Sequence, residues 1–266
     1  LYDEENRIWV DFADIPDQVK KAAIAIEDER FYKHSGFDIK STAKAVYTYV
    51  FKHSTARGAS TITQQLVKNL TGETKKTPVR KVQEIIRAVN LERKLSKDQI
   101  LELYLNTIYL SQGCNGLGSA ANFYFDKDVK DLTVAEGACL VGITQYPTRY
   151  DPIQNPENNK EKQKLVLGKM LSLGYIDQKT YDEAVAEELK FKKKEEITSQ
   201  SKQSYFVDEI VRQVLKDLQE QKGYTEALAT KMLYSGGLSI YSTVDPVVQK
   251  AMNDVYTNDS NFVKAP

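Results

Sequence analysis

Helical periodicity is the feature that most constrains the fold of this chain. Apolar residues recur at helical spacing through most of the first 190 positions, whereas alternating strand patterns are scarce there. Pro16 and Asp17 mark one helix start, and Val19, Ala22 and Ile26 follow on a single face. The pattern predicts a mainly helical, compact domain over residues 1–190.

Several short polar motifs predict where other helices begin. Thr61 with Gln64 and Ser96 with Gln99 have the spacing of capping boxes. Thr133 and Glu136 introduce a further apolar helix, and Asp177 starts another. A helix from about Val79 to Lys94 is expected to turn its apolar residues inward and its charged ones outward; the inward set is Val82, Ile85, Ile86 and Val89, and the outward set is Arg80, Glu84 and Arg87.

The chain changes character after residue 190. Phe191 to Ser204 is a charged and polar run that indicates a domain boundary. Tyr205 to Gln219 has helical periodicity, and Gly237 to Val244 alternates like a strand. Residues 191–266 are therefore expected to form a short α/β linker segment and the start of a second domain.

Composition excludes some classes of protein. The chain has 37 Lys and Arg against 37 Asp and Glu, a balance that argues against a general nucleic-acid binder, so no nucleic-acid partner is expected. Cys114 and Cys139 lack metal-ligand spacing and are interpreted as buried apolar residues. No apolar run is long enough to span a membrane. The sequence begins abruptly at Leu1, and an anchoring helix upstream of this chain is expected.

Two glutamates stand in contrasting surroundings. Glu27 ends an apolar helical stripe, whereas Glu84 follows Arg80 and Lys81. Contrasting environments separate the roles of two carboxylates, which is what acid and base chemistry on a sugar requires. For Glu84 the alternative is an exposed ion pair with Arg80, four residues earlier, worth a few tenths of a kcal/mol.

A local anion site is also predicted. Gly58 to Thr61 lead into a helix start, where free backbone donors and the helix dipole favour negative charge. Basic residues follow at Lys68, Lys75, Lys76, Arg80, Lys81 and Arg87. They indicate a site for a polyanion such as a diphosphate; a simple helix cap beside a solvated basic face is the alternative. His34 and His53 lack the neighbours that a zinc site needs.

Four motifs occur in order along the chain. They comprise Glu27, Asp28, Phe31, His34 and Gly36; Gly58, Ser60, Thr61, Ile62, Thr63, Gln64 and Gln65; Arg80, Lys81 and Glu84; and Lys97, Ile100, Leu101, Glu102, Tyr104, Leu105 and Asn106. Together they resemble the glycosyltransferase domain of class A (bifunctional) penicillin-binding proteins, glycosyltransferase family 51, over roughly Leu1 to Leu189. Two positions depart from the family pattern: Thr144 stands where a proline is usual, and Lys76 where arginine is frequent.

The resemblance implies a lysozyme-like helical fold and the polymerisation of lipid II into glycan strands, with inversion at the donor anomeric carbon and release of undecaprenyl diphosphate. It implies Glu27 and Glu84 as catalytic residues, Glu27 being the general base. The substrate-binding residues that it implies are Asp28, Phe31, His34, Ser60, Thr61, Gln64, Gln65, Lys68, Lys76, Arg80, Lys81, Asn106 and Tyr109. No cofactor is expected to be obligatory, with a divalent cation, Mg or Mn, as an option.

The same resemblance implies the surroundings of the protein. Its partners would be lipid II, the nascent glycan strand, the membrane surface and the cell-wall synthesis machinery, at the extracytoplasmic face of the bacterial cytoplasmic membrane. The apolar stretch from about Val46 to Ala56 is expected to contact that membrane. A lysozyme-like hydrolase and a non-catalytic glycan- or lipid-binding module are the competing interpretations.

Overall fold

The structure is a computed structural model that describes residues 8–40, 42–43, 60–72, 77–192, 205–224, 229, 232–233, 238 and 240–256. Contacts between Cα atoms divide the chain into two compact units, one within Glu4–Ile197 and one made up chiefly of Thr198–Pro266. Each unit is considered by itself. In the described part of the chain, no helix combines the length and the apolar character that crossing a membrane would require.

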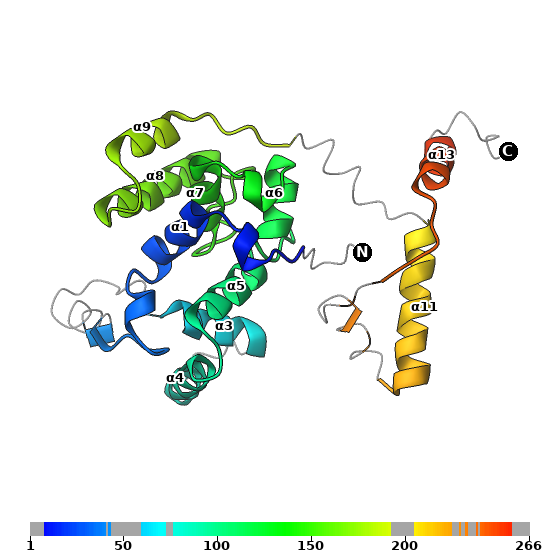
Figure 1. Ribbon diagram of the computed structural model, residues 1–266, viewed down its shortest axis with the longest axis horizontal. Coiled ribbons are helices and arrows are strands. Elements are labelled where there is room, and N and C mark those ends of the chain that lie inside the picture. The colour runs from blue at the N-terminus through cyan, green and yellow to red at the C-terminus, as the bar shows by residue number, and fades with distance from the viewer. Residues whose placement is uncertain are drawn as a thin grey trace. The chain divides into compact units, whose positions relative to one another are not determined.

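The larger unit is built from helices (Figure 1). In chain order these are η1 (Phe12–Asp14), α1 (Asp17–Glu27), η2 (Phe31–Lys33), α3 (Ile62–Thr71), α4 (Pro78–Glu92), α5 (Lys97–Thr107), α6 (Leu117–Phe125), η3 (Val129–Asp131), α7 (Val134–Ile143), α8 (Pro156–Ser172) and α9 (Gln178–Ala186). The second unit contains α11 (Tyr205–Lys222) and α13 (Pro246–Tyr256). The expected mainly helical fold is confirmed.

The predicted helix starts at Thr61, Ser96 and Thr133 are also confirmed. Each side-chain oxygen accepts a hydrogen bond from the backbone N–H three residues later, and the Gln or Glu at that position accepts one from the backbone N–H of the cap residue. Two of the backbone donors that every helix start leaves without a partner are thereby satisfied. These boundaries depend on contacts within four residues, which is why sequence alone locates them.

Helix α7 forms the centre of the core. Every residue from Ala135 to Ile143 is buried, and all of them except Glu136, which pairs with Lys127, are apolar or glycine. It packs against α1 and α8, while α3 packs against α4 and α5 (Figure 1). The end of α1 at Glu27 and the first turns of α3 meet through side-chain hydrogen bonds, and the predicted site residues gather there.

The predicted orientation of α4 is wrong for Val82, Ile86 and Glu84, whereas Arg87 is exposed as predicted and Ile85 and Val89 are partly buried. Val82 and Ile86 are 56% and 54% exposed, whereas Glu84 is only 5% exposed. The inward face carries the small residue Ala88, which packs at the backbone of Gly36, together with Glu84 and its cationic partners. Because its charge is paired, the carboxylate tolerates burial, while Val82 and Ile86 lie on the exposed face.

The strand predicted over Gly237–Val244 is not observed in the described residues of that segment. Leu238 and Ile240 to Val244 have no regular secondary structure. A strand requires a neighbour for its ladder of hydrogen bonds, and the described residues include no second strand beside this segment. The short linker is therefore helical and irregular where the structure describes it.

Candidate active site

Glu27 lies at the junction of three structural elements. It is the last residue of α1 and is partly buried. Gln65 on α3 donates from Nε2 to Glu27 Oε2 at 2.8 Å, and Thr144, directly after α7, donates from Oγ1 to Glu27 Oε1 at 2.5 Å. Each carboxylate oxygen therefore has one donor, and each keeps a further lone pair that could accept another hydrogen bond.

Tyr104 on α5 holds the Gln65 side chain in place. Its hydroxyl donates to Gln65 Oε1 at 3.2 Å, and this contact sets which end of the Gln65 amide faces Glu27. Burial raises the pKa of Tyr104 well above its ordinary value, and the negative charges of Glu27 and Asp28 raise it further. Tyr104 therefore remains a neutral donor over the whole physiological pH range.

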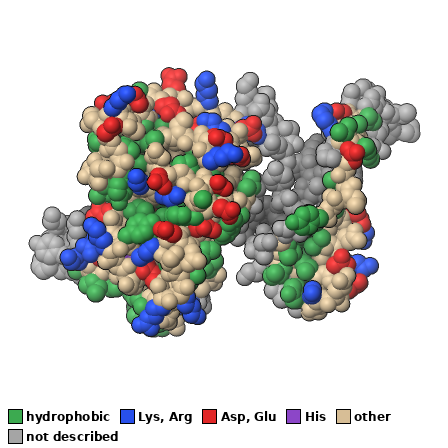
Figure 2. Space-filling view, in the orientation of Figure 1, with side chains coloured by type: hydrophobic (Ala, Val, Ile, Leu, Met, Phe, Trp, Pro, Cys, Tyr) green, Lys and Arg blue, Asp and Glu red, His purple; other side chains and the backbone are tan. Residues whose placement is uncertain are grey.

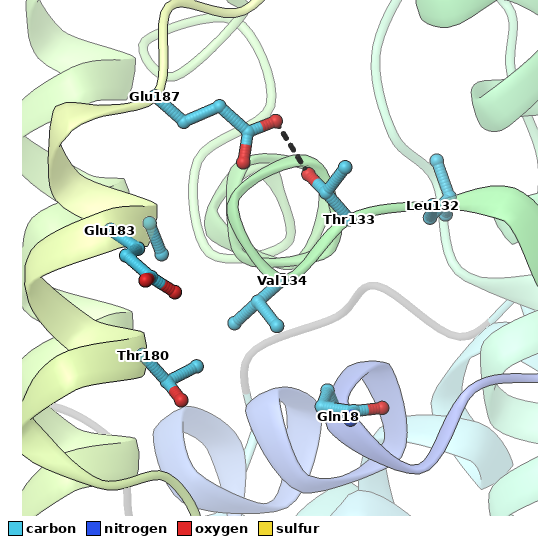
Figure 3. Close-up of a pocket in the computed structure, with 8 residues that line it drawn as sticks. Gln18, Leu132, Thr133, Val134, Thr180, Glu183 and Glu187 are labelled. Carbon is cyan, nitrogen blue, oxygen red and sulfur yellow. Dashed lines mark hydrogen bonds between the residues drawn. The ribbon is translucent and has the colours of Figure 1, made fainter.

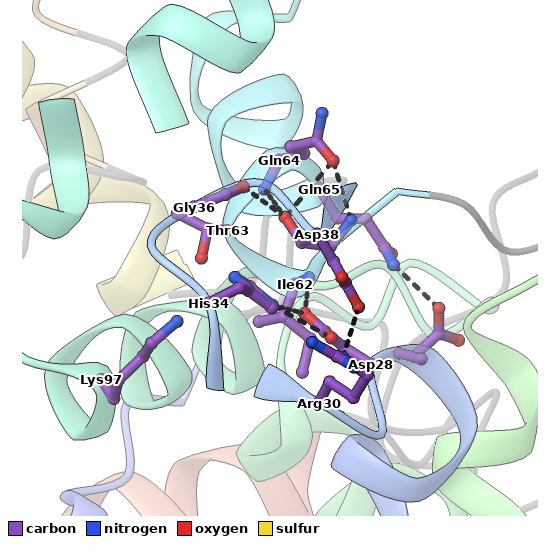
Figure 4. A network of polar contacts seen from close by, with 12 residues as sticks. Asp28, Arg30, His34, Gly36, Asp38, Ile62, Thr63, Gln64, Gln65 and Lys97 are labelled. Carbon is purple, nitrogen blue, oxygen red and sulfur yellow. Dashed lines mark hydrogen bonds and ion pairs between the residues drawn. The ribbon is translucent and has the colours of Figure 1, made fainter. Parts of the chain in front are cut away.

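Asp28 fixes the start of α3. Its Oδ2 accepts from the backbone N–H of Ile62 at 3.1 Å and lies 2.9 Å from His34 Nε2 (Figure 4). Because a carboxylate only accepts, the proton of that contact belongs to His34 Nε2. The predicted substrate-binding residues Asp28 and His34 are thus brought together, and both are used within the protein to hold the loop after α1 against α3.

Another carboxylate, that of Glu92, lies 4.0 Å from His34 Nδ1, and its side chain is only 6% exposed. Its Oε1 accepts from Thr63 Oγ1 at 2.5 Å and from Lys97 Nζ at 2.7 Å. The Lys97 ammonium also stands 4.4 Å from the ring centroid of Phe31, which is fully buried. Phe31 therefore supports the loop from inside the core. Glu92 was missed by sequence reasoning, since nothing local distinguishes it from a surface glutamate.

Glu84 belongs to a separate ion cluster. Arg80 Nη1 lies 2.6 Å from Glu84 Oε2, and Lys81 Nζ contacts Glu84 Oε1. Lys81 Nζ also donates to Ser60 Oγ at 2.9 Å, which ties α4 to the residue before the cap of α3. The alternative of an exposed ion pair is wrong, because Glu84 is buried. Two cations around one carboxylate leave a net positive charge at this end of α3.

The other predicted substrate-binding residues around the start of α3 differ in how exposed they are to solvent. Thr61 Oγ1 donates to the backbone oxygen of Gly36 at 2.8 Å, and Gln64 is completely buried in the capping box. Lys68 is exposed in the last turn of α3. In Figure 2, Lys and Arg side chains gather over the end of the unit where Figure 1 places α4. Gly58, Lys76 and the stretch from Val46 to Ala56 lie outside the described residues.

Asn106 lies in the last turn of α5, and Tyr109 follows two residues after the helix ends. Asn106 is buried, its Nδ2 donates to the backbone oxygens of Val10 and Glu102, and its Oδ1 accepts from the Val10 N–H. Tyr109 is half exposed and forms an isolated β-bridge with Asn115. The hydrogen bonds of these two residues do not reach the Glu27 network, so their roles in substrate binding stay predictions.

Glu27 lies apart from the cavity between α1, α7 and α9, and the described residues around it form no metal-ligand cluster. The described residues contain no group of three His, Cys, Asp or Glu side chains placed to hold a metal ion. A cavity of about 330 Å³ lies between α1, α7 and α9 (Figure 3). Its lining residue on α1 is Gln18, nine residues before Glu27, which is roughly 14 Å along a helix. The cavity therefore belongs to the opposite end of α1.

Comparison with known proteins agrees with the motifs. The transglycosylase family model matches residues 1–171. Penicillin-binding protein 1F of Bacillus subtilis is 40% identical over 258 residues, which cover 97% of this chain and 35% of that protein. Penicillin-binding protein 1A of Neisseria lactamica is 41% identical over 254 residues, covering 96% and 30%. The crystal structure of penicillin-binding protein 1A from Haemophilus influenzae has a TM-score of 0.46 at 24% identity and covers 84% of this chain and 23% of that one.

The chain thus spans about a third of the length of the curated relatives it matches. The family model nevertheless covers well over half of this chain and includes every candidate site residue from Glu27 to Tyr109. The resemblance to the glycosyltransferase domain of class A penicillin-binding proteins is therefore confirmed. The chain belongs to the transglycosylase family, and it is a glycosyltransferase.

Proposed function

We propose that this enzyme polymerises lipid II into glycan strands, with inversion at the donor anomeric carbon and release of undecaprenyl diphosphate. The observation that carries the proposal is the setting of Glu27, a carboxylate oriented by two donors at the junction of α1, α3 and the end of α7. A positioned carboxylate with free lone pairs suits a general base. The cationic cluster at the start of α3 suits a diphosphate leaving group.

In the proposed reaction Glu27 takes the proton of the acceptor sugar hydroxyl. The oxygen that loses this proton forms a bond to the anomeric carbon of the growing donor strand. The bond from that carbon to the diphosphate breaks, and its electron pair leaves with the diphosphate lipid. Attack from the face opposite the leaving group inverts the carbon.

Negative charge grows on the leaving diphosphate, and the basic residues are proposed to stabilise it. Arg80 and Lys81 are held by Glu84, and Lys81 also reaches Ser60 just before the cap of α3. Fixed cations stabilise developing charge without having to reorganise during the reaction. Glu84 then acts by positioning these cations, and Lys68 offers an exposed ammonium on α3.

The other predicted site residues are proposed to support the same reaction. Asp28, Phe31 and His34 shape the loop beside Glu27, while Thr61, Gln64 and Gln65 build the start of α3. Lys76, Asn106 and Tyr109 are proposed to contact the substrate, and a divalent cation, Mg or Mn, is an option at the diphosphate. Because lipid II is a membrane lipid, the enzyme is proposed to act at the extracytoplasmic face of the cytoplasmic membrane, together with the cell-wall synthesis machinery.

Substitution Glu27→Gln tests the assignment of the base. The amide keeps the shape of the side chain but cannot take up the proton, so strand formation should fall at least about a hundredfold. Labelled lipid II is incubated with the enzyme, and strand length and released diphosphate lipid are measured. Glu29→Gln is the matched control, because Glu29 is exposed two residues further on, and it should retain the wild-type rate.

Three results would contradict the proposal. Undiminished strand synthesis by Glu27→Gln would remove Glu27 as the base. Shortening of preformed glycan, without growth from lipid II, would establish a lysozyme-like hydrolase instead. Binding of lipid II without any product would indicate a non-catalytic module.

A further inference from the structure

We infer that Thr144 is a positioning residue that serves Glu27 in both of its protonation states. The inference rests on the proposed role of Glu27 as general base. Thr144 is 117 residues away from Glu27 in the sequence and is brought to it by the packing of α7 against α1. Thr144 is the first residue after α7, and α7 is held in place by the core that surrounds it.

The hydroxyl of Thr144 has two partners within hydrogen-bond distance. Its Oγ1 lies 2.5 Å from Glu27 Oε1 and 2.9 Å from the backbone oxygen of Val141. A hydroxyl carries one proton and two lone pairs, so it can donate to only one of these oxygens at full strength. While Glu27 is ionised, donation to the carboxylate is favoured, because hydrogen bonds to charged acceptors are shorter and stronger.

The same geometry serves the protonated state. After Glu27 has taken the proton of the acceptor sugar, a proton on Oε1 can be donated to a lone pair of Thr144 Oγ1. The proton of Thr144 then turns to Val141, whose backbone oxygen is already in place. No heavy atom needs to move, and neither state leaves a buried polar group without a partner.

Gln65 cannot make this exchange. Its Nε2 can only donate, and its Oε1 already accepts from the hydroxyl of Tyr104. When the proton is on Oε1, Gln65 can still donate to Oε2, but it cannot accept the proton of the carboxyl group. Of the two side chains that bond Glu27, Thr144 is the one whose hydroxyl can either donate a hydrogen bond to the carboxylate or accept one from the carboxyl group.

Substitution Thr144→Val tests the inference, since it removes the hydroxyl and keeps the branched shape. We expect kcat with lipid II to fall roughly tenfold to a hundredfold, the range for a hydrogen bond to a charged group, while KM changes less than about twofold. Thr144→Ser should restore most of kcat, because serine supplies the same hydroxyl. Thr107→Val is the matched control: this partly buried hydroxyl at the end of α5 donates only to backbone oxygens of its own helix, and kcat should not change.

A wild-type kcat for Thr144→Val, or a loss that Thr144→Ser does not repair, would overturn the inference. A double-mutant cycle with Glu27→Ala and Thr144→Val, measured as changes in Tm, tests the contact between the two side chains without relying on activity. The Tm loss caused by Thr144→Val should largely disappear in the Glu27→Ala background. Additive Tm losses would refute the contact. If wild-type enzyme makes no strands from lipid II, the proposed function fails, and the cycle still decides whether Thr144 serves Glu27.

Discussion

At the scale of single residues, Gly36 sets how closely the loop after α1 approaches α4. Its φ is +87°, a region that favours glycine, and a Cβ atom built there would lie 2.7 Å from the backbone carbon of Ala88. Its carbonyl also accepts from Thr61 Oγ1, the cap of α3. One small residue therefore joins the loop that carries His34 to both α3 and α4.

Gly36→Ala is expected to lower the free energy of unfolding by about 2–4 kcal/mol, because it adds a clash with backbone to the strain of positive φ. Urea unfolding measures the change. Gly72→Ala separates the two effects: its φ is +64°, but a Cβ there meets nothing within 4 Å, so it should cost only about 1 kcal/mol. Equal losses for the two variants would show that the close approach to Ala88 does not matter.

At the scale of structural elements, α4 buries the charged residue Glu84 and exposes the apolar residues Val82 and Ile86. Glu84→Gln should lower the free energy of unfolding by about 1–3 kcal/mol, since it removes a buried carboxylate that bonds Arg80 and Lys81. Val82→Ser should change it by about 0.5 kcal/mol or less, because Val82 faces solvent and the two residues have similar helix propensities.

Urea denaturation of both variants decides between the two orientations of the helix. A large loss for Val82→Ser with little effect of Glu84→Gln would support the orientation that periodicity predicted.

The same helix shows how far sequence reasoning extends. Helix starts such as Thr61 and Ser96 are predictable because their hydrogen bonds close within a few residues. The face of α4 is not, because burial of Glu84 depends on Lys81 reaching Ser60, which is 21 residues away. For the site, motif spacing pointed to Glu27 and Gln65, whose side chains the structure brings into contact. The role of Thr144 depends on a contact across 117 residues, and its one signal in the sequence was a departure from the usual proline.

At the scale of the whole molecule, the predicted site residues that the structure describes lie within the unit of Glu4–Ile197. The end of this unit is attached to its core. Glu187 accepts from Thr133 Oγ1 at 2.7 Å, the Lys192 N–H donates to the Tyr124 backbone oxygen at 2.9 Å, and Phe191 stacks on Phe125. These contacts fasten the segment after α9 to the ends of α6 and α7.

A chain shortened to end at Ile197 should therefore unfold cooperatively with a Tm within a few degrees of the full chain, and it should polymerise lipid II at the full-length rate. Ending the chain at Ala186 instead removes the contacts of Glu187, Phe191 and Lys192, and should lower the free energy of unfolding by about 2–4 kcal/mol, the sum of lost hydrogen bonds and aromatic burial. Calorimetry and strand synthesis compare the two truncations. If the Ile197 truncation unfolds as early as the Ala186 truncation, folding of the catalytic unit depends on residues beyond 197, and the division into two self-supporting units does not hold in solution.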